Sequence, residues 1–358
     1  MFRKTYVEVN LDNIQSNVKF FRNRSEKKII GVIKANGYGT IDYMEAKALK
    51  EVGVAFFAVS SLDEALRLRA HGIDDKIVVL GYVPLESMDI IREKNISIVT
   101  LSREFVQKAD LKDVNVQMKI NTGMNRIGIN PDDAKQVLEL LKGKGANIEG
   151  IMSHLSSADN DPEYSLKQYE LFRNCVTSLH YDFSCIHMNA TDSAIIIKDD
   201  FCTHQRIGLG LLGFSSYNVP VKPAIRLFSE VVMVKKLNKG ETVSYGRHYT
   251  SDGSGYILTL PVGYGDGFFR ANSGKQVYIG KEDATIAGSI CMDQMMIHTE
   301  IPYETGTIVE LFGDHISIED RAKELNTITY ELLTNITDRV SRVYIKDGMV
   351  IETIDQRL

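Results

Sequence analysis

Residues 55–81, AFFAVSSLDEALRLRAHGIDDKIVVLG, contain two short apolar runs separated by an amphipathic stretch with helical periodicity. Ser61 is placed to cap this helix, Glu64 suits its first turn, and Gly72 follows its last turn. The segment therefore predicts a strand, a helix and a second strand, which is the unit that builds parallel sheets.

The same alternation extends over the first two-thirds of the chain, without a Pro- or Gly-rich linker. Eight apolar runs alternate mostly with helical patterns; they span 27–34, 55–60, 76–81, 96–101, 114–120, 148–154, 184–189 and 205–210. Eight such units favour a closed (β/α)8 TIM barrel. A doubly wound open sheet is the competing architecture, but no GxGxxG motif follows the first strand.

The pattern changes after about residue 225. Strand-like runs divided by Gly and Asp turns follow, with helical stretches at 317–326 and 327–336 and a hairpin predicted around Asp347-Gly348. We predict a barrel domain over 1–225 and a mostly β domain over 226–358, in which the first ten or so residues can pair with the second domain. A chain of 358 residues is long enough for two cores.

The composition restricts the partners and the compartment. A net charge of -5 argues against nucleic acid as the main partner, because phosphate binding needs a basic surface. The apolar stretches are too short for a secretory signal or a membrane span. The cysteines lack CxxC spacing, so we expect a cytoplasmic protein with buried free thiols at Cys175, Cys185, Cys202 and Cys291.

Barrel enzymes place their chemistry at the C-terminal ends of the strands and often bind phosphate after the last two. The predicted strands put a cation, an imidazole, a hydroxyl and a glycine backbone there: Lys34, Arg126, His154, Thr191, Arg206 and Gly208. Each residue alone has an ordinary structural explanation, such as a solvated lysine or a hydrogen-bonded histidine. Their joint position predicts one functional site at the barrel mouth.

Five blocks, in matching order, resemble the alanine racemase family. VIKANGYG (32–39) looks like its pyridoxal 5′-phosphate (PLP) lysine signature; the others are RIGLGLLG (206–213), SYGRHYT (244–250), PVGYGDGFFR (261–270) and SICMDQ (289–294). The match covers nearly the whole chain. It implies interconversion of L- and D-alanine, PLP bound at the barrel mouth, and a head-to-tail homodimer in which each second domain completes the other subunit's site.

The resemblance also implies roles for individual residues. Lys34 would hold PLP as a Schiff base and act as one of two bases, and Tyr245 matches the other base, contributed by the partner subunit. The implied cofactor contacts are Tyr38, Thr191, Gly208 and Leu209 at the phosphate, His154 beside the ring, and Arg206 at the pyridine nitrogen. An always-charged guanidinium there discourages protonation of that nitrogen and should restrain transamination.

On the substrate side, Arg126 matches an arginine that binds the carboxylate and orients the tyrosine. Tyr264 and Met292 match partner residues at the substrate entrance. Lys119 stands at the position of a lysine that is often carbamylated and braces the arginine, and no metal is implied. These roles agree with racemisation, which needs an electron sink and acid/base groups on opposite faces of the α-carbon.

Three positions depart from the family pattern. Thr40 replaces the histidine of YGHG, residues 187–191 read HMNAT where HxxNS is usual, and Asp338 replaces a tyrosine that touches the phosphate and limits the pocket. Loss of that ring predicts a larger pocket, so serine or a basic amino acid such as lysine or ornithine is an alternative substrate. Asp338 could instead pair with Arg339 or lie on a displaced helix end.

Other classes of protein share the barrel. A type III PLP decarboxylase would carry a different acid near its site, and the SYG and GYGDG blocks argue against it. A non-catalytic PLP-binding protein would keep the barrel and the lysine but lack the second domain and Tyr245. A purely structural barrel is a weaker alternative still.

Overall fold

The computed structural model describes residues 2–357, which form two compact units. One unit comprises Asn13–Lys222, and the other joins the N-terminal segment up to Asp12 to the chain from Pro223 onwards. In the described range, every helix is too short or too polar to cross a membrane.

Residues 13–222 form a closed barrel of eight parallel strands, which confirms the predicted fold of this part. Closure occurs between β9 and β2, where Lys28 pairs with His204 and Gly31 with Ile207. Each strand lies within one residue of a predicted apolar run: β2 (Lys28–Val32), β3 (Phe56–Val59), β4 (Lys76–Val79), β5 (Ser97–Val99), β6 (Asn115–Lys119), β7 (Asn147–Met152), β8 (Cys185–His187) and β9 (His204–Ile207).

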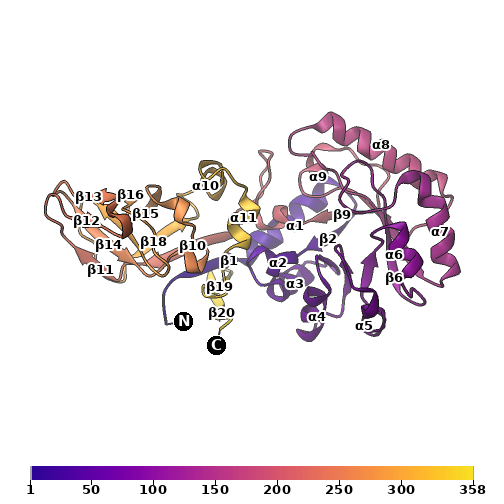
Figure 1. Ribbon diagram of the computed structural model, residues 1–358, viewed down its shortest axis with the longest axis horizontal. Helices are drawn as coiled ribbons and strands as arrows, with labels where there is room; N and C mark the ends of the chain where they lie inside the picture. Colours follow the sequence, from indigo (N-terminus) through magenta and orange to yellow (C-terminus); the bar gives the residue numbers. More distant parts are fainter. Residues whose placement is uncertain (1, 358) are drawn as a thin grey trace. The chain divides into compact units, whose positions relative to one another are not determined.

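Helices between the strands cover the outside of the barrel (Figure 1). The strands are buried on both faces as a result, which explains why most of their residues are apolar; Gln117, Lys119, Gln205 and Arg206 are buried polar exceptions on β6 and β9. The α-helices are α1 (Leu11–Arg24), α2 (Lys34–Tyr38), α3 (Asp42–Glu51), α4 (Leu62–Ala70), α5 (Met88–Glu93), α6 (Arg103–Lys108), α7 (Ala134–Gly143), α8 (Pro162–Ser178) and α9 (Ser193–Ile196). Short 3₁₀ turns are η1 (Leu85–Ser87), η2 (Pro131–Asp133) and η3 (Leu209–Leu212).

Helix α4 begins as its sequence predicts. The Ser61 hydroxyl accepts the Glu64 N–H at 3.3 Å, and the Glu64 carboxylate accepts the Ser61 N–H at 3.3 Å. This capping box satisfies two N–H groups that the first turn leaves without helical partners. Gly72, just after the helix, has φ of +78°, a left-handed value that favours glycine.

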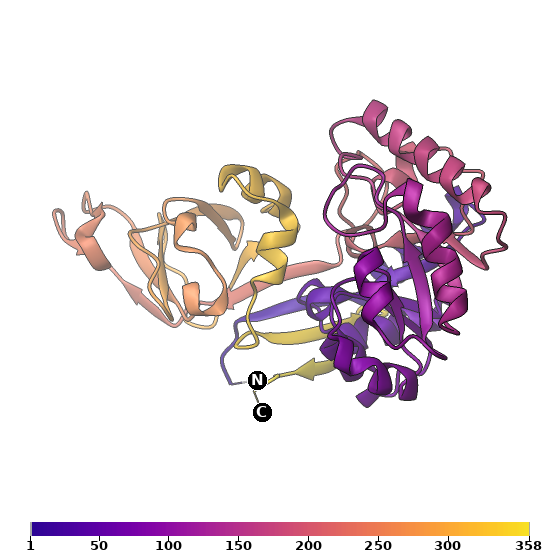
Figure 2. The ribbon, with the colours of Figure 1, turned by 45° about the vertical axis from the view of Figure 1, so that its right-hand side comes forward.

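The second unit is built on a sheet of ten strands, which confirms the mostly β prediction. Figure 2 shows the indigo β1 (Tyr6–Asn10) beside the yellow β19 (Ser341–Lys346), to which it is parallel. The other strands are β10 (Ile225–Glu230), β11 (Met233–Lys235), β14 (Tyr256–Leu260), β15 (Gln276–Ile279), β16 (Glu282–Ile286), β17 (Met295–Thr299), β18 (Ile308–Phe312) and β20 (Met349–Ile354). A separate pair joins β12 (Thr242–Val243) to β13 (Tyr249–Thr250).

The rest of this unit consists of two helices and three 3₁₀ turns, α10 (Ile318–Glu324), α11 (Thr329–Thr334), η4 (Tyr245–Arg247), η5 (Tyr264–Asp266) and η6 (Arg270–Asn272). Asp347 and Gly348 join β19 to β20 with φ of +51° and +71°, as a tight hairpin requires. The four cysteines are free thiols. The prediction of burial is wrong for Cys291, which is only half-buried because it lies in the turn beside Met292.

Candidate active site

Lys34 follows β2 and begins a turn of unusual hand. Ala35, Asn36, Gly37 and Tyr38 have φ of 52°, 55°, 64° and 52°, so α2 is a left-handed turn rather than an ordinary helix. The left-handed conformation costs about 1–2 kcal/mol for each residue that carries a Cβ. The turn is therefore strained, and it places half-buried Lys34 and buried Tyr38 at its two ends.

Side chains of α4 hold this strained turn. Glu64 Oε1 accepts the Ala35 N–H at 2.6 Å, and Arg67 donates to Asn36 Oδ1. Arg67 also forms an ion pair with buried Asp42 at 2.6 Å. Glu64 was not predicted to belong to the site, because its capping pattern indicated only a helix start.

Arg206, on β9, makes more side-chain hydrogen bonds than any other predicted site residue. Its guanidinium donates to His187 Nδ1 at 2.7 Å and to His154 Nδ1 at 3.0 Å. It also donates to the carbonyl oxygens of Ser153 (2.8 Å), Met188 (2.8 Å) and His187 (3.2 Å). Among the described residues, none accepts a hydrogen bond from Nε or forms an ion pair with Arg206. Burial lowers its pKa to about 10, so it stays charged at neutral pH.

The Arg206 contacts fix the protonation of both imidazoles. A guanidinium only donates, so the Nδ1 atoms of His154 and His187 accept and their protons lie on Nε2. His187 Nε2 then donates to Gln117 Oε1 at 3.3 Å. Burial, followed by the Arg206 charge, holds the pKa of both histidines well below the usual range. His154 is therefore a neutral ring, while His187 and Gln117 are supporting residues that the sequence analysis missed.

Positive charge gathers around Lys34. Burial is the main cause that lowers the pKa of Lys34, followed by Arg126, whereas Glu64 acts in the opposite direction. Lys119 is 4% exposed, and burial, Arg206 and Arg126 lower its pKa to about 7. Within the described chain, no hydrogen bond or ion pair is found at Lys119 Nζ. This concentration of cations is suited to a ligand with several negative charges.

A candidate cradle for an anion follows the last strand. The amide of Gly210 donates to Thr191 Oγ1 at 3.1 Å, and Gly208 and Leu209 supply the first amides of η3, which lack acceptors within the helix. A Cβ on Gly208 would lie 2.5 Å from the Tyr38 hydroxyl, so only glycine lets Tyr38 pack there. The structure thus brings together Tyr38, Thr191, Gly208 and Leu209, the four residues whose phosphate contacts remain a prediction.

The other predicted residues lie in the second unit. Tyr245 is 74% exposed, Met292 52% and Tyr264 41%. The Tyr264 N–H donates to the Cys291 carbonyl at 3.1 Å, and the Gly265 N–H donates to the Met292 carbonyl at 2.9 Å. These bonds hold Tyr264 and Met292 on adjoining turns. An exposed tyrosine and methionine are available to meet another surface.

Asp338 is exposed and has no ion pair within the described chain. The alternative that it pairs with Arg339 is wrong. Arg339 instead contacts Asp266 at 3.3 Å and Asp293 at 2.5 Å, because those carboxylates lie on the turns that pack beside it. Helix α11 ends at Thr334, and Asp338 lies in the turn before β19.

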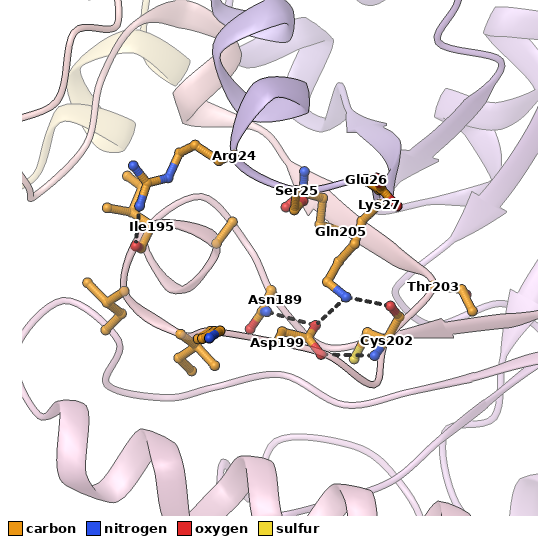
Figure 3. Close-up of a pocket in the computed structure, with 14 residues that line it drawn as sticks. Arg24, Ser25, Glu26, Lys27, Asn189, Ile195, Asp199, Cys202, Thr203 and Gln205 are labelled. Carbon is orange, nitrogen blue, oxygen red and sulfur yellow. Dashed lines mark hydrogen bonds and ion pairs between the residues drawn. The ribbon is translucent and has the colours of Figure 1, made fainter.

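The shifted asparagine of the HMNAT stretch has a structural role. Asn189 lines a pocket of about 600 Å³, whose other walls include the end of α1, α9 and the segment before β9. Figure 3 shows Asn189 among these lining residues. Asn189 Nδ2 donates to Asp199 at 3.0 Å, and Asp199 also accepts the Tyr169 hydroxyl at 2.6 Å and lies 3.5 Å from Lys27. None of the predicted site residues lines this pocket.

A closed (β/α)8 barrel with a lysine after its first strand and a glycine-containing 3₁₀ turn after its last, followed by a β domain, defines the barrel class of amino-acid racemases. Residues 9–216 match the model of the alanine racemase N-terminal domain, and residues 224–344 match that of the C-terminal domain. The chain belongs to the alanine racemase family, whose members depend on PLP.

Individual relatives agree over nearly the full length. The chain is 35% identical to the alanine racemase of Staphylococcus epidermidis, over 97% of this chain and 96% of the relative. It is similar to the crystal structure of alanine racemase from Bacillus anthracis with bound L-Ala-P, with a TM-score of 0.93, 31% identity, and coverage of 99% and 98%. A histidine racemase from Leuconostoc mesenteroides has a TM-score of 0.88 at 26% identity, with coverage of 96% and 99%.

Proposed function

We propose that this chain binds PLP and interconverts L- and D-alanine by two-base proton transfer at Cα. The observation that carries the proposal is the set of donors around Lys34. The Lys34 amine, whose pKa is lowered, suits the Schiff base, and the neutral imidazole of His154 suits the side of the ring. Arg206 Nε, which makes no hydrogen bond within the described chain, suits the pyridine nitrogen. The phosphate would be held by Tyr38, Thr191, Gly208 and Leu209. When bound, PLP supplies an electron sink that stabilises negative charge at Cα.

The chain's own residues supply the proton chemistry. Burial and neighbouring cations lower the pKa of Lys34, so a larger fraction of its Nζ is the neutral base that can remove or return a proton at Cα. The Tyr245 hydroxyl serves the opposite face. Arg126 is exposed and carries no ion pair within the described chain, so it can bind the substrate carboxylate. Arg206, fixed by five hydrogen bonds, keeps a positive charge where the pyridine nitrogen would lie.

We propose a homodimer in which the partner's second domain supplies Tyr245, Tyr264 and Met292. Their exposure supports this arrangement, because exposed tyrosine and methionine side chains are available to be covered by another surface. Burial against a partner subunit would by itself disfavour the phenolate, so the positive charges at the barrel mouth would be needed to favour it.

We also propose that Lys119 carries a carbamate. With a pKa of about 7, a large fraction of its amine is unprotonated at neutral pH. Its Nζ can attack CO₂ to form an N–C bond and release one proton. The product is an anion close to Arg126 and Arg206, whose charges it would partly neutralise.

A basic amino acid is the alternative substrate. The exposed Asp338 carboxylate has no ion pair within the described chain, because Arg339 is engaged elsewhere. A structural relative that is a histidine racemase shows that this architecture accepts a larger side chain in that protein. We expect Asp338→Tyr to raise alanine turnover relative to lysine, ornithine, histidine and serine; an unchanged ratio would remove the support for this alternative.

The experiment is chiral chromatography of the protein purified with PLP and incubated separately with the L-forms of alanine, serine, lysine, ornithine and histidine. Dominant alanine conversion supports the proposal, and dominant conversion of a basic substrate supports the alternative. Lys34→Ala should lose the visible absorbance of the bound cofactor as well as turnover. Cofactor binding by a monomer that converts none of the five would revive the binding-protein interpretation.

A further inference from the structure

The left-handed turn rests on a buried acid that the proposed chemistry does not use. Glu45, on α3, is 1% exposed. Its Oε2 lies 3.1 Å from the Thr40 hydroxyl oxygen, which lies 2.7 Å from the Gly37 carbonyl oxygen in the middle of the turn. Within the described chain, Oε1 is buried and makes no hydrogen bond. Thr40 thus connects Glu45 to the backbone of the turn.

A proton count decides the state of this acid. A threonine hydroxyl carries one proton, and the shorter contact, to the Gly37 carbonyl, takes it. With that proton assigned to the Gly37 carbonyl, the Thr40 oxygen accepts in its contact with Glu45, so the proton between Thr40 and Glu45 belongs to Glu45. An ionised carboxylate with one buried oxygen unpaired would also be costly.

The surrounding charges agree with a neutral acid. Asp42 is the charged group that acts on Glu45, and it repels a second negative charge. The nearby cation, Arg67, is paired with Asp42 at 2.6 Å, and within the described chain no ion pair involves Glu45. Burial is the largest cause that raises the pKa of Glu45 well above its usual range.

We propose that Glu45 is a protonated carboxylic acid that acts through Thr40 as a positioning residue for the turn from Lys34 to Tyr38. The inference rests on the proposed function, since it gives the turn its purpose of spacing the lysine from a phosphate contact. Glu64 holds the peptide of Ala35, Arg67 holds the side chain of Asn36, and the Thr40–Glu45 pair holds Gly37.

The packing at Gly37 shows how closely this pair supports the turn. A Cβ on Gly37 would lie 2.6 Å from Thr40 Oγ1 and 2.8 Å from Glu45 Oε2. The Glu45 carboxyl group therefore packs directly against the strained backbone at Gly37. Removing this group would leave the turn without a hydrogen-bonded support at that point. Because the residues that carry a Cβ resist the left-handed conformation, the turn should then sample other conformations.

The protonation is tested first on the cofactor-free protein, by infrared difference spectroscopy at pH 7 of wild type minus Glu45→Gln. We expect a carbonyl stretch of a protonated carboxylic acid that is present in the wild type and absent from the variant. The matched control is Glu139→Gln, whose side chain is 63% exposed and paired with Lys142; its difference spectrum should show loss of an ionised carboxylate. Loss of that same carboxylate signal in Glu45→Gln would overturn the proposal.

The positioning role is tested by titrating each variant with PLP and following its visible absorbance, after urea unfolding has shown that the variant folds. Glu45→Gln keeps a neutral donor to Thr40, so we expect a PLP Kd within about twofold of wild type. Glu45→Leu removes the donor and should weaken PLP about tenfold, the equivalent of about 1.4 kcal/mol. Equal effects of the Gln and Leu variants, or no effect of Leu, would overturn the role.

Thr40→Val serves where Glu45→Leu does not fold. It removes the hydroxyl that links the acid to Gly37 with little change in volume, and it should weaken PLP about as much as Glu45→Leu. An affinity like that of the wild type would overturn the link. Failure of the wild type to bind PLP would instead overturn the proposed function, and the infrared result would stand apart from it.

Discussion

Replacing Arg206 by lysine keeps the positive charge but removes the planar guanidinium group, which donates hydrogen bonds to five acceptors. The acceptors are the Nδ1 atoms of His154 and His187 and the carbonyl oxygens of Ser153, His187 and Met188. An ammonium group donates at most three hydrogen bonds, so at least two acceptors lose the bond from Arg206; among the five, the His187 carbonyl also accepts the Ser153 N–H, so at least one acceptor is left unpaired. Each unpaired acceptor costs about 1–3 kcal/mol, and we expect Arg206→Lys to lower the free energy of unfolding by about 1–6 kcal/mol.

The assay is urea unfolding of the cofactor-free protein, extrapolated linearly to water. The matched control is Arg173→Lys on α8, where the arginine side chain is 42% exposed and contacts Asp200 at 3.4 Å; we expect a change within about 0.5 kcal/mol there. A loss below 1 kcal/mol for Arg206→Lys would refute the reasoning, because it would mean that the acceptors are satisfied without the guanidinium.

Three further predictions test separate parts of the site. Folded Lys119 releases its proton near pH 7, whereas an unfolded lysine keeps it to about pH 10.4. Urea unfolding in CO₂-free buffer should therefore show the wild type gaining stability relative to Lys119→Met as the pH rises from 7 to 10. A stability difference that does not change with pH would contradict the burial of this amine. Tyr245→Phe should lower the rate of racemisation about 10²–10⁴-fold and leave the free energy of unfolding unchanged, since the ring is 74% exposed. Chiral chromatography measures the rate, with Tyr330→Phe on α11 as the control. Full activity of Tyr245→Phe would exclude this tyrosine as a base. Gly208→Ala should cost about 1–3 kcal/mol of stability, because its Cβ would lie 2.5 Å from the Tyr38 hydroxyl. The control is Gly143→Ala, whose Cβ would have no described atom within 4 Å and should cost nothing. Equal unfolding curves for the two variants would show that Tyr38 moves aside without cost.

Local signals in the sequence were sufficient for the elements. The apolar runs located the starts of the eight barrel strands to within one residue, because strands buried on both faces are mostly apolar; the strands end one to three residues before the runs do. Ser61 and Glu64 gave the start of α4, and Asp347-Gly348 gave the hairpin. In the cap and the hairpin, the deciding interaction joins residues a few positions apart, so the local sequence is enough to predict it.

The candidate site was predictable only in part. The positions of Lys34, His154, Thr191, Arg206 and Gly208 near strand ends follow from the barrel, since all parallel strands end at one mouth. Their states do not follow. The neutral imidazoles depend on Arg206, which lies 19 residues from His187 and 52 from His154.

The sequence by itself therefore determined the order of strands and helices and the residue types available at the barrel mouth, because these depend on local periodicity and capping. Only the tertiary structure decided which partner each charged group has. It turned Arg339 toward Asp266 and Asp293 and left Asp338 without an ion pair among residues 2–357, and it enclosed Glu45 beneath a left-handed turn. Hydrogen bonding, burial and charge act through space, and the segments that supply them meet only when the chain has folded.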